Sequence, residues 1–223
     1  FFAKTGDDAI NYVAELARRT GTNLAIKSKS LTSEEIEFNH ELEKRGVKAI
    51  ETDLGELIIQ LVNEKPVHLV MPAAHKSAQD VAEIFAKETK REVPADPEAI
   101  LRIVRSYLRP IFLSAEMGVS GANIGVAETG SIVLETNEGN GRLVTSLPRT
   151  HVVLMGMEKI VPSWNDVAEL VVGHAISATG QSMTVYVSLI TQHVRLAGSN
   201  EGREFHVIIL DNGRTKMRED PWY

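Results

Sequence analysis

Apolar and polar residues alternate along the chain with two different periods, which predict strands and helices in alternation. Short β-branched runs at 24–27, 48–51 and 68–71 each precede a stretch in which apolar residues recur at helical spacing. This order is typical of parallel βαβ units. The spacing predicts helices over 7–20, 33–46, 54–63, 78–90, 97–110 and 164–176.

Four of these helices have a recognisable start, in which an N-cap side chain is followed three residues later by a carboxylate. The four pairs are Thr32 with Glu35, Asp53 with Glu56, Ser77 with Asp80, and Ser163 with Asp166. Each pair predicts that a helix begins directly after its first member.

The chain changes character after Gly118, where strands predominate. Two apolar runs, Ala122–Ala127 and Ser131–Thr136, are separated by Glu128-Thr-Gly130, and the glycine there permits a positive φ. This pattern indicates a tight turn inside a sheet. Further strands are predicted at 151–155, 184–190 and 205–210, which makes about eight in all, and 194–203 is the most loop-like stretch.

No internal repeat, low-complexity tract or interdomain linker divides the chain, so we expect one domain over 1–223. We expect it to be an α/β domain, with a mostly parallel sheet and flanking helices. A chain of 223 residues is long enough to bury about 70% of its unfolded surface. Because it opens on Phe1 rather than Met and stops at Tyr223, we also expect it to be a piece of a longer protein.

Composition argues against several classes of protein. No apolar run approaches the roughly 18 residues of a membrane span, and a formal net charge of -6 without a basic stripe argues against nucleic-acid binding. The absence of cysteine excludes disulfides, thiolate-bound zinc, a cysteine nucleophile and an all-cysteine iron–sulfur cluster within this chain. The histidines show no metal-ligand spacing, and Gly121–Gly125 lacks the full dinucleotide fingerprint.

Gly118–Val144 holds six of the sixteen glycines and is the first candidate for a binding loop, because glycine lets backbone N–H groups approach an anion closely. Arg142 is the natural clamp for a carboxylate or phosphate. The alternative interpretation is a pair of β-turns that link strands. The candidate binding residues of this stretch are Ser120, Gly121, Asn123, Thr129, Gly130, Asn137, Glu138, Gly139, Asn140 and Arg142.

Two residues are candidates for moving a proton. Glu128 lies at a strand end among apolar neighbours, a position that suits a general base or a nucleophile, although a solvated turn carboxylate shows the same pattern. His75 follows the third predicted strand and is a candidate proton shuttle. The alternative for His75 is an exposed or hydrogen-bonded loop histidine.

Further candidates for binding lie next to predicted strands. Lys27 and Lys29 follow the first strand and Lys76 follows the third, and open α/β sheets bind ligands at this carboxyl edge. Lysines there either attract an anion or belong to solvated loops. Thr179 and Gln181 precede a later strand and offer a hydroxyl and an amide.

Many short motifs stand in the order found in one known family. They are Lys27–Ser30, Ser33–Ile36, Glu51–Glu56, Pro72–Lys76, Gly121–Asn123, Ala127–Gly130, Thr136–Arg142, Leu147–Pro148, Met157–Pro162, Ser177–Gln181 and Leu210–Arg214. In this order the chain resembles the LUD domain of the lactate-utilisation protein B family, whose members are iron–sulfur proteins of the bacterial L-lactate oxidation complex. The resemblance covers nearly the whole chain.

The resemblance implies a cytoplasmic complex that oxidises L-lactate to pyruvate together with the other lactate-utilisation subunits. It implies a fold similar to the sugar-phosphate isomerase and CoA-transferase superfamily. Family members continue beyond the region of 211–214 into a cysteine-rich ferredoxin-like module that binds two 4Fe-4S clusters. This chain has no cysteine, so we expect that module to follow residue 223 in a longer protein. The 194–203 stretch is also shorter than the linker that the resemblance implies.

The residues and the resemblance lead to one main hypothesis and two alternatives. In the main hypothesis, Arg142, the glycine-rich stretch and the lysine and histidine loops bind a small 2-hydroxy or 2-keto carboxylate. Glu128 or His75 takes the hydroxyl proton, and a redox partner or cofactor outside this chain accepts the electrons. The first alternative is a CoA-transferase-like enzyme that uses Glu128 as its nucleophile. The second is a non-catalytic scaffold for assembly and electron relay.

Overall fold

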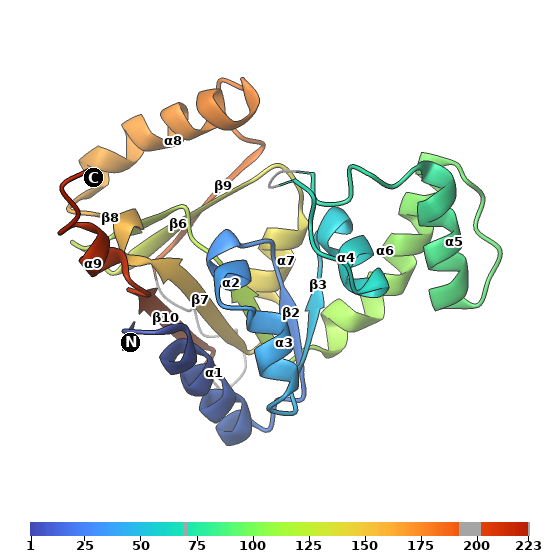
Figure 1. Ribbon diagram of the computed structural model, residues 1–223, viewed down its shortest axis with the longest axis horizontal. Coiled ribbons are helices and arrows are strands. Elements are labelled where there is room, and N and C mark those ends of the chain that lie inside the picture. Colours follow the sequence, from blue (N-terminus) through green and yellow to red (C-terminus); the bar gives the residue numbers. More distant parts are fainter. Residues whose placement is uncertain (69–70, 192–201, 223) are drawn as a thin grey trace.

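The computed structural model describes residues 1–68, 71–191 and 202–222, and its central element is a six-stranded sheet (Figure 1). The strands run in the order β1-β10-β7-β4-β2-β3, and every neighbouring pair is parallel. This confirms the predicted α/β class with a mostly parallel sheet. The strand bounds are Phe2–Ala3 (β1), Glu204–Leu210 (β10), Thr150–Gly156 (β7), Met117–Ser120 (β4), Leu24–Lys27 (β2) and Lys48–Glu51 (β3).

Helices cover both faces of this sheet. Because successive side chains of a strand point to opposite faces, one strand can contribute to two cores. Ala25 of β2 and Ala49 of β3 belong to a core shared with α1 and α3. Their neighbours Ile26 and Ile50 belong to a second core shared with α4, α5 and α6. The helix bounds are Gly6–Thr20 (α1), Phe38–Glu43 (α3), Leu54–Val62 (α4), Ala78–Thr89 (α5) and Pro97–Ser114 (α6).

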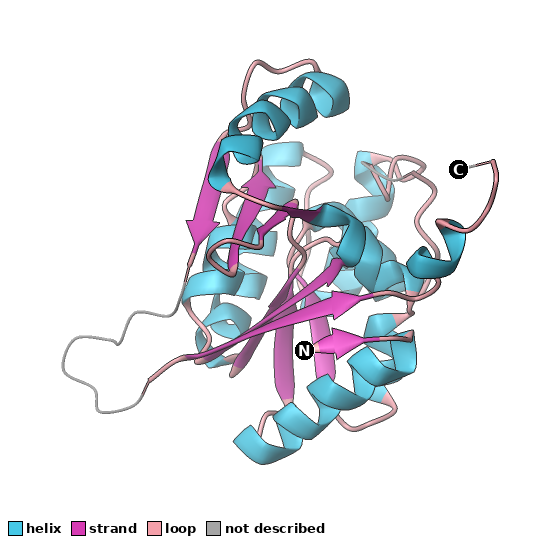
Figure 2. Cartoon of the chain, turned by 90° about the vertical axis from the view of Figure 1, so that its left-hand side faces the viewer, coloured by secondary structure: helices cyan, strands magenta, loops and turns pink. Residues whose placement is uncertain are grey.

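A second, four-stranded sheet lies beside the first, in the order β8-β5-β6-β9 (Figure 2). Its β5 and β6 form an antiparallel hairpin with Gly130 at φ 66° in the turn, which confirms the predicted tight turn. Val167 and Val171 of α8 pack against this sheet. The bounds are Ile160–Val161 (β8), Ile124–Val126 (β5), Ser131–Thr136 (β6), Tyr186–Ile190 (β9) and Trp164–Thr179 (α8).

Three of the four predicted helix starts are confirmed. Asp53 caps α4 by accepting a hydrogen bond from the backbone N–H of Glu56. Ser77 and Ser163 form capping boxes at the starts of α5 and α8. These caps follow from the sequence because each bond joins residues three positions apart.

The fourth predicted start is wrong, and so is the single helix over 33–46. The segment forms two short helices, α2 (Leu31–Glu35) and α3, because Glu37 takes φ 49° between them. Ser30, rather than Thr32, accepts the capping hydrogen bond at the start of α2. The turn between the two helices lets α3 pack against β3.

Strands β1, β4 and β8 are not predicted by the sequence pattern. They are two to four residues long, so no alternation is visible in them, and their partners are distant in sequence. The predicted strand at 68–71 has its middle, 69–70, outside the described residues, and so does most of 194–203. The remaining elements are α7 (Asn140–Ser146), the 3-10 helix η1 (Met157–Lys159) and α9 (Arg214–Met217).

Helix α7 lies directly against β4. A Cβ atom at Gly118 of β4 would overlap the backbone oxygen of Val144 in α7, so only glycine fits at this contact. Asn140 at the start of α7 donates a hydrogen bond of 3.2 Å to the Thr52 hydroxyl after β3. The hydrogen bond to Thr52 holds the start of α7 at the carboxyl edge of the parallel sheet.

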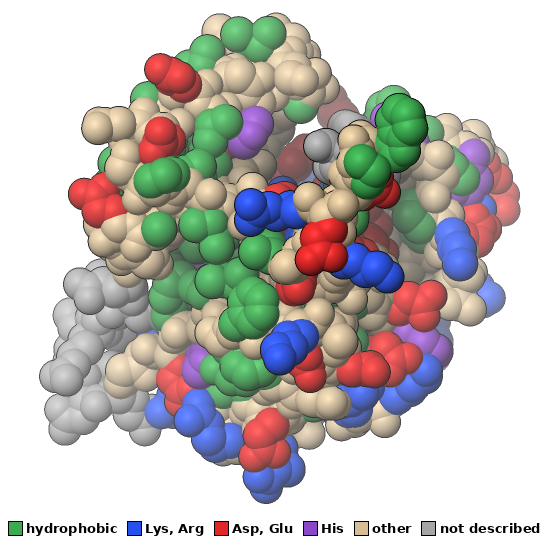
Figure 3. Space-filling model, turned by 60° about the vertical axis from the view of Figure 1, so that its left-hand side comes forward, with side chains coloured by type: hydrophobic (Ala, Val, Ile, Leu, Met, Phe, Trp, Pro, Cys, Tyr) green, Lys and Arg blue, Asp and Glu red, His purple; other side chains and the backbone are tan. Residues whose placement is uncertain are grey.

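The end of β10 is tied to the body of the domain by Arg214. Its guanidinium group contacts Glu35 at 2.8 Å and Glu158 at 2.5 Å, and these carboxylates raise its pKa above the usual value. On the face of the molecule that Figure 3 shows, hydrophobic side chains gather between charged ones. Among the described helices, none combines the length and the hydrophobicity needed to span a membrane.

Candidate functional site

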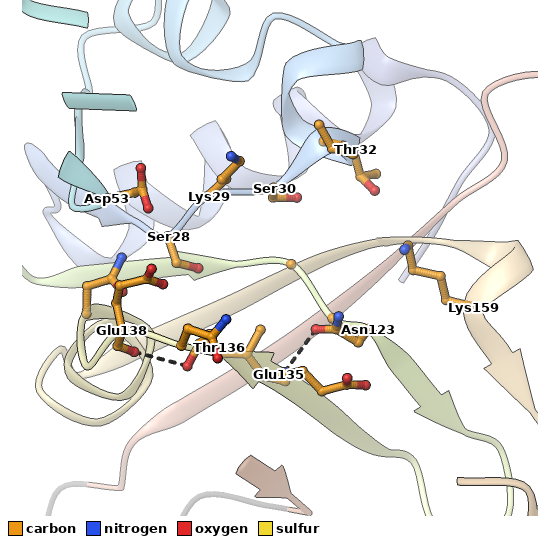
Figure 4. A pocket seen from close by; sticks show the side chains of 16 residues that line it. Ser28, Lys29, Ser30, Thr32, Asp53, Asn123, Glu135, Thr136, Glu138 and Lys159 are labelled. Carbon is orange, nitrogen blue, oxygen red and sulfur yellow. Dashed lines mark hydrogen bonds between the residues drawn. The ribbon is translucent and has the colours of Figure 1, made fainter. Parts of the chain in front are cut away.

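The residues that directly follow β2 and β4 line a polar cavity of about 300 Å³, which we call the polar cleft (Figure 4). The cleft therefore lies at the carboxyl edge of the parallel sheet, where open α/β sheets bind ligands. Its lining residues are Ser28, Lys29, Ser30, Leu31, Thr32, Asp53, Gly121, Ala122, Asn123, Leu134, Glu135, Thr136, Asn137, Glu138, Asn140 and Lys159.

One wall of the polar cleft is the loop from β2 to α2, which presents hydroxyl groups (Figure 4). Ser30 is held in place as the cap of α2, and it receives a 2.6 Å hydrogen bond from the Ser33 hydroxyl at its backbone oxygen. Ser28 is 4% exposed, and its hydroxyl has no hydrogen-bond partner among the described residues. A buried hydroxyl without a partner is uncommon in folded proteins, which points to a ligand or water at this place.

The loop from β4 to β5 closes the cleft against that wall. A Cβ atom at Gly121 would come within 3.0 Å of the Ser30 hydroxyl oxygen, so the glycine allows the two loops to approach closely. Asn123 fixes the loop to β6, because its side-chain oxygen accepts a 3.0 Å hydrogen bond from the backbone N–H of Glu135. Both residues were predicted to bind ligand, and both line the polar cleft.

The opposite wall is formed by the end of β6 and the segment that leads into α7. Thr136 donates a hydrogen bond to the backbone oxygen of Glu138, and the side chain of Asn137 accepts one from Val185. Together with the bond from Asn140 to Thr52, these contacts fix the backbone of 136–140. The alternative interpretation as a simple β-turn does not hold here, because the segment forms a turn followed by α7.

Two lysines and three carboxylates line the polar cleft. The Glu135 carboxylate is 3.0 Å from His174 Nδ1, and the Lys29 ammonium group is 3.8 Å from Glu56. Lys159 comes from η1 and lies in no ion pair with a carboxylate of the described residues. The two ammonium groups approach from different elements, which suits an anion held between them.

Lys27 does not face the cleft, although it is only two residues from Lys29. It is fully buried, with its Nζ 2.7 Å from Glu51 and 3.3 Å from Glu34. Burial lowers the pKa of Lys27, but attraction to Glu51 and Glu34 outweighs burial and leaves the pKa above its usual value. The predicted ligand contact of Lys27 is replaced by a buried ion pair that joins β2, β3 and α2.

Glu56 connects this buried network to the polar cleft through Lys29. Burial, followed by repulsion from Glu51 and Glu34, raises the pKa of Glu56 to about 7. The position of Lys29 beside the cleft is therefore coupled to a carboxyl group that changes charge near neutral pH.

Arg142 lines a separate cavity of about 1090 Å³, which we call the arginine groove. Its guanidinium carbon lies 5.2 Å from the centre of the Tyr186 ring. The groove and the polar cleft share three lining residues, Asp53, Glu138 and Asn140. Arg142 and Gly139 are thus neighbours of the polar cleft without lining it.

His75 and Lys76 lie away from both cavities. They hold the same carboxylate, Glu64, at 2.7 and 2.6 Å, and Lys76 with His75 keeps the pKa of Glu64 below its usual value. His75 is therefore a hydrogen-bonded loop histidine, which is the alternative to the predicted proton shuttle.

The remaining predicted residues are also outside the polar cleft. Glu128, at the end of β5, accepts a hydrogen bond of 3.3 Å from the backbone N–H of Trp164. Ser120 is buried and lies 2.8 Å from His151 Nε2. The other contacts are those of Thr129 with Ser131, of Thr179 with Ala175 and Gln181, and of Gly130 in the β5–β6 turn.

The structure therefore brings together six of the predicted binding residues, namely Lys29, Gly121, Asn123, Asn137, Glu138 and Asn140. Sequence reasoning missed Ser28, Ser30 and Thr32, although the first two belong to the Lys27–Ser30 motif. It also missed Lys159, which lies within the quoted Met157–Pro162 motif. No group of three or more histidine, aspartate or glutamate side chains in the described part of the chain is arranged to hold a metal ion.

Comparison with known protein families identifies the family to which this chain belongs. The family model for the LUD domain matches residues 1–210. The chain belongs to the LUD domain family. The match confirms the resemblance carried by the ordered motifs, and it includes every residue that lines the polar cleft.

Curated relatives align with nearly the whole LUD domain. The chain is 44% identical over 218 residues to "Uncharacterized electron transport protein YkgF" of Escherichia coli (strain K12), covering 97% of this chain and 46% of the relative. It is 42% identical over 218 residues to "Lactate utilization protein B 1" of Bacillus mycoides (strain KBAB4), covering 97% of this chain and 45% of the relative. The chain thus spans about half the length of the curated relatives it matches.

A solved structure is also similar to part of the LUD domain. It is the crystal structure of a DUF162 family protein from Deinococcus radiodurans, at a TM-score of 0.33 and 20% identity. The similarity covers 45% of this chain and 57% of that chain.

Proposed function

We propose that the polar cleft binds a small 2-hydroxy or 2-keto carboxylate, and that the LUD domain takes part in the oxidation of L-lactate to pyruvate. The proposal places the domain in a cytoplasmic complex with other lactate-utilisation subunits. It is supported by relatives named lactate utilization protein B and by a relative named as an electron transport protein.

The observation that carries the proposal is the composition of the cleft. Lys29 and Lys159 approach it from different elements, and the buried hydroxyl of Ser28 has no partner among the described residues. Lysine groups bind a carboxylate by charge-assisted hydrogen bonds, and hydroxyl groups suit the oxygen on the adjacent carbon. A volume of about 300 Å³ suits a ligand of a few heavy atoms.

Oxidation of a hydroxy acid requires a base within hydrogen-bond reach of the hydroxyl group. Glu128 and His75 do not line the polar cleft, so the proposal assigns this role to a carboxylate that does. Glu138 is the choice, because Asp53 caps α4 and Glu135 contacts His174. Glu138 is exposed and lies on the wall that the cleft shares with the arginine groove.

The electrons of lactate leave the domain in this proposal. The two 4Fe-4S clusters implied by the resemblance do not fit the residues present, because the chain has no cysteine to ligate them. The proposal therefore assigns the clusters to the part of the longer relatives that this chain does not span. The polar cleft contributes binding, orientation and proton transfer.

Calorimetric titration with L-lactate and with pyruvate tests the site. We expect Lys29→Gln and Lys159→Gln each to weaken binding about tenfold or more, because each removes a charge-assisted hydrogen bond. Lys76→Gln is the matched control, since it removes the same charge outside the cleft. Arg142→Ala is expected to bind both acids as the wild type does. No binding by the wild type, or binding by both cleft variants as tight as that of the wild type, would exclude the polar cleft as a carboxylate site.

The scaffold alternative is favoured by one observation, which is that neither Glu128 nor His75 reaches the cleft. Lactate oxidation by the full-length complex separates the two functions. A catalytic cleft requires a loss of turnover in Glu138→Gln, whereas a scaffold keeps its turnover. The CoA-transferase alternative rests on the expected superfamily similarity, but its nucleophile, Glu128, does not line the polar cleft.

A further inference from the structure

The arginine groove is a second candidate ligand site, and a small carboxylate bound in the polar cleft would leave it empty. Its volume of about 1090 Å³ is more than three times that of the polar cleft, at about 300 Å³. Small-molecule sites have volumes of roughly 300–1,000 Å³, so the groove is large enough for a cofactor-sized ligand. Residues of α6, α7 and β9 form most of its lining.

Three arginines line the groove, and they are not neutralised by neighbours. Within residues 1–68, 71–191 and 202–222, no carboxylate forms an ion pair with Arg105, Arg109 or Arg142. The carboxylates among the described lining residues, Asp53 and Glu138, lie on the wall shared with the polar cleft. On a chain with net charge -6, this is a local concentration of positive charge.

The arginines are arranged to act together. Arg105 and Arg109 are four residues apart on α6, so they project from the same face with Cβ atoms about 5–6 Å apart. Long side chains that start from neighbouring Cβ atoms can reach the same diphosphate, and each guanidinium group can then bind one phosphate in a bidentate manner. Arg142 joins them from α7, and its place over the Tyr186 ring restricts its orientation.

The groove also carries several exposed apolar side chains. Leu101, Leu113 and Leu143 are 48%, 68% and 41% exposed, and Leu108 and Phe112 extend the apolar lining along α6. Exposed apolar side chains gathered around unpaired cations suit a ligand that carries both kinds of group. Phosphate groups alone would leave the leucines without a function, and a fatty acid would leave at least one arginine unpaired.

We propose that the arginine groove binds an organic diphosphate, that is, a ligand in which a diphosphate group is joined to an apolar or aromatic body. Arg105, Arg109 and Arg142 hold the phosphates, while the leucines of α6 and α7 cover the body. The shared residues Asp53, Glu138 and Asn140 place one end of the ligand beside the polar cleft.

Two kinds of molecule with this chemistry each match one function considered above. A dinucleotide redox cofactor would bring an electron acceptor beside the polar cleft. An acyl thioester of coenzyme A would bring an acyl group there. The reaction beside the cleft rests on the proposed function, but binding of the diphosphate does not.

The test is calorimetric titration of the LUD domain with four probes: ADP as the shared part, then FAD, NAD+ and acetyl-CoA. Arg105→Gln/Arg109→Gln is expected to weaken ADP binding at least tenfold. Arg102→Gln is the matched control, because it removes one charge from the same helix outside the groove, where Arg102 faces Glu98. This control is expected to bind ADP within about twofold of the wild type.

The outcomes separate the two sources and the two proposals. Binding of FAD or NAD+ at least tenfold tighter than ADP supports a redox cofactor, whereas the same gain for acetyl-CoA supports an acyl carrier. No binding of any probe at millimolar concentration, or equal loss in the groove and control variants, overturns the inference. The groove variants are expected to keep lactate and pyruvate binding, so ADP binding without lactate binding contradicts the proposed function alone.

Discussion

Glu56 offers the sharpest test of how charge is arranged behind the polar cleft. Its side chain is 7% exposed, and its pKa is raised from 4.5 to about 7, mainly by burial. The unfolded chain therefore releases this proton at lower pH than the folded domain does. The stability that comes from protonated Glu56 is fully present below about pH 4.5, and it is lost as the pH rises through about 7.

Replacement of Glu56 by glutamine removes this pH dependence. A tenfold change in proton affinity corresponds to about 1.4 kcal/mol, so ionised Glu56 costs the folded domain about 3 kcal/mol above pH 7. At pH 5 the cost is below about 1 kcal/mol. The difference in unfolding free energy between Glu56→Gln and the wild type is thus expected to be about 2–3 kcal/mol larger at pH 8 than at pH 5, in favour of the variant.

Urea denaturation followed by circular dichroism at pH 5 and pH 8 measures this gain. Glu43→Gln is the matched control, because Glu43 and Glu56 line one cavity together with Glu34 and Glu51, but Glu43 is exposed. It reports the effect of losing one negative charge without relief of burial. A stability difference between Glu56→Gln and wild type that is the same at both pH values, or larger at pH 5, would refute the reasoning.

Two further predictions concern the framework of the site. Lys27→Met leaves Glu51 buried without its cation, so we expect a loss of about 3–5 kcal/mol in urea denaturation, largely restored when Glu51→Gln is added. Gly118→Ala forces a Cβ atom against the Val144 backbone oxygen and is expected to lower stability by about 2 kcal/mol or more. Gly173→Ala is its control, because nothing lies within 4 Å of the new atom, and thermal denaturation should show a gain of about 0.5–1 kcal/mol. Equal effects of the two alanines would contradict the close approach of α7 to β4.

Features determined by near neighbours in sequence were predictable. Asp53, Ser77 and Ser163 cap their helices because the hydrogen bond of a cap reaches only three residues along the chain. The turn at Gly130 follows from one glycine between two apolar runs. The ordered motifs likewise indicated the LUD domain before any contact was known.

The composition of the polar cleft depended on contacts between distant residues. Lys27 and Lys29 look equivalent in sequence, yet Lys27 is buried because Glu51 and Glu34 arrive from other elements. Arg142 was expected beside the lysines, but α7 carries it toward Tyr186. The sequence by itself determined the family, the alternation of strands and helices, and the local caps. Only the tertiary structure decided which charges are neutralised in the interior and which line the cleft, because burial depends on elements that meet only in the folded chain.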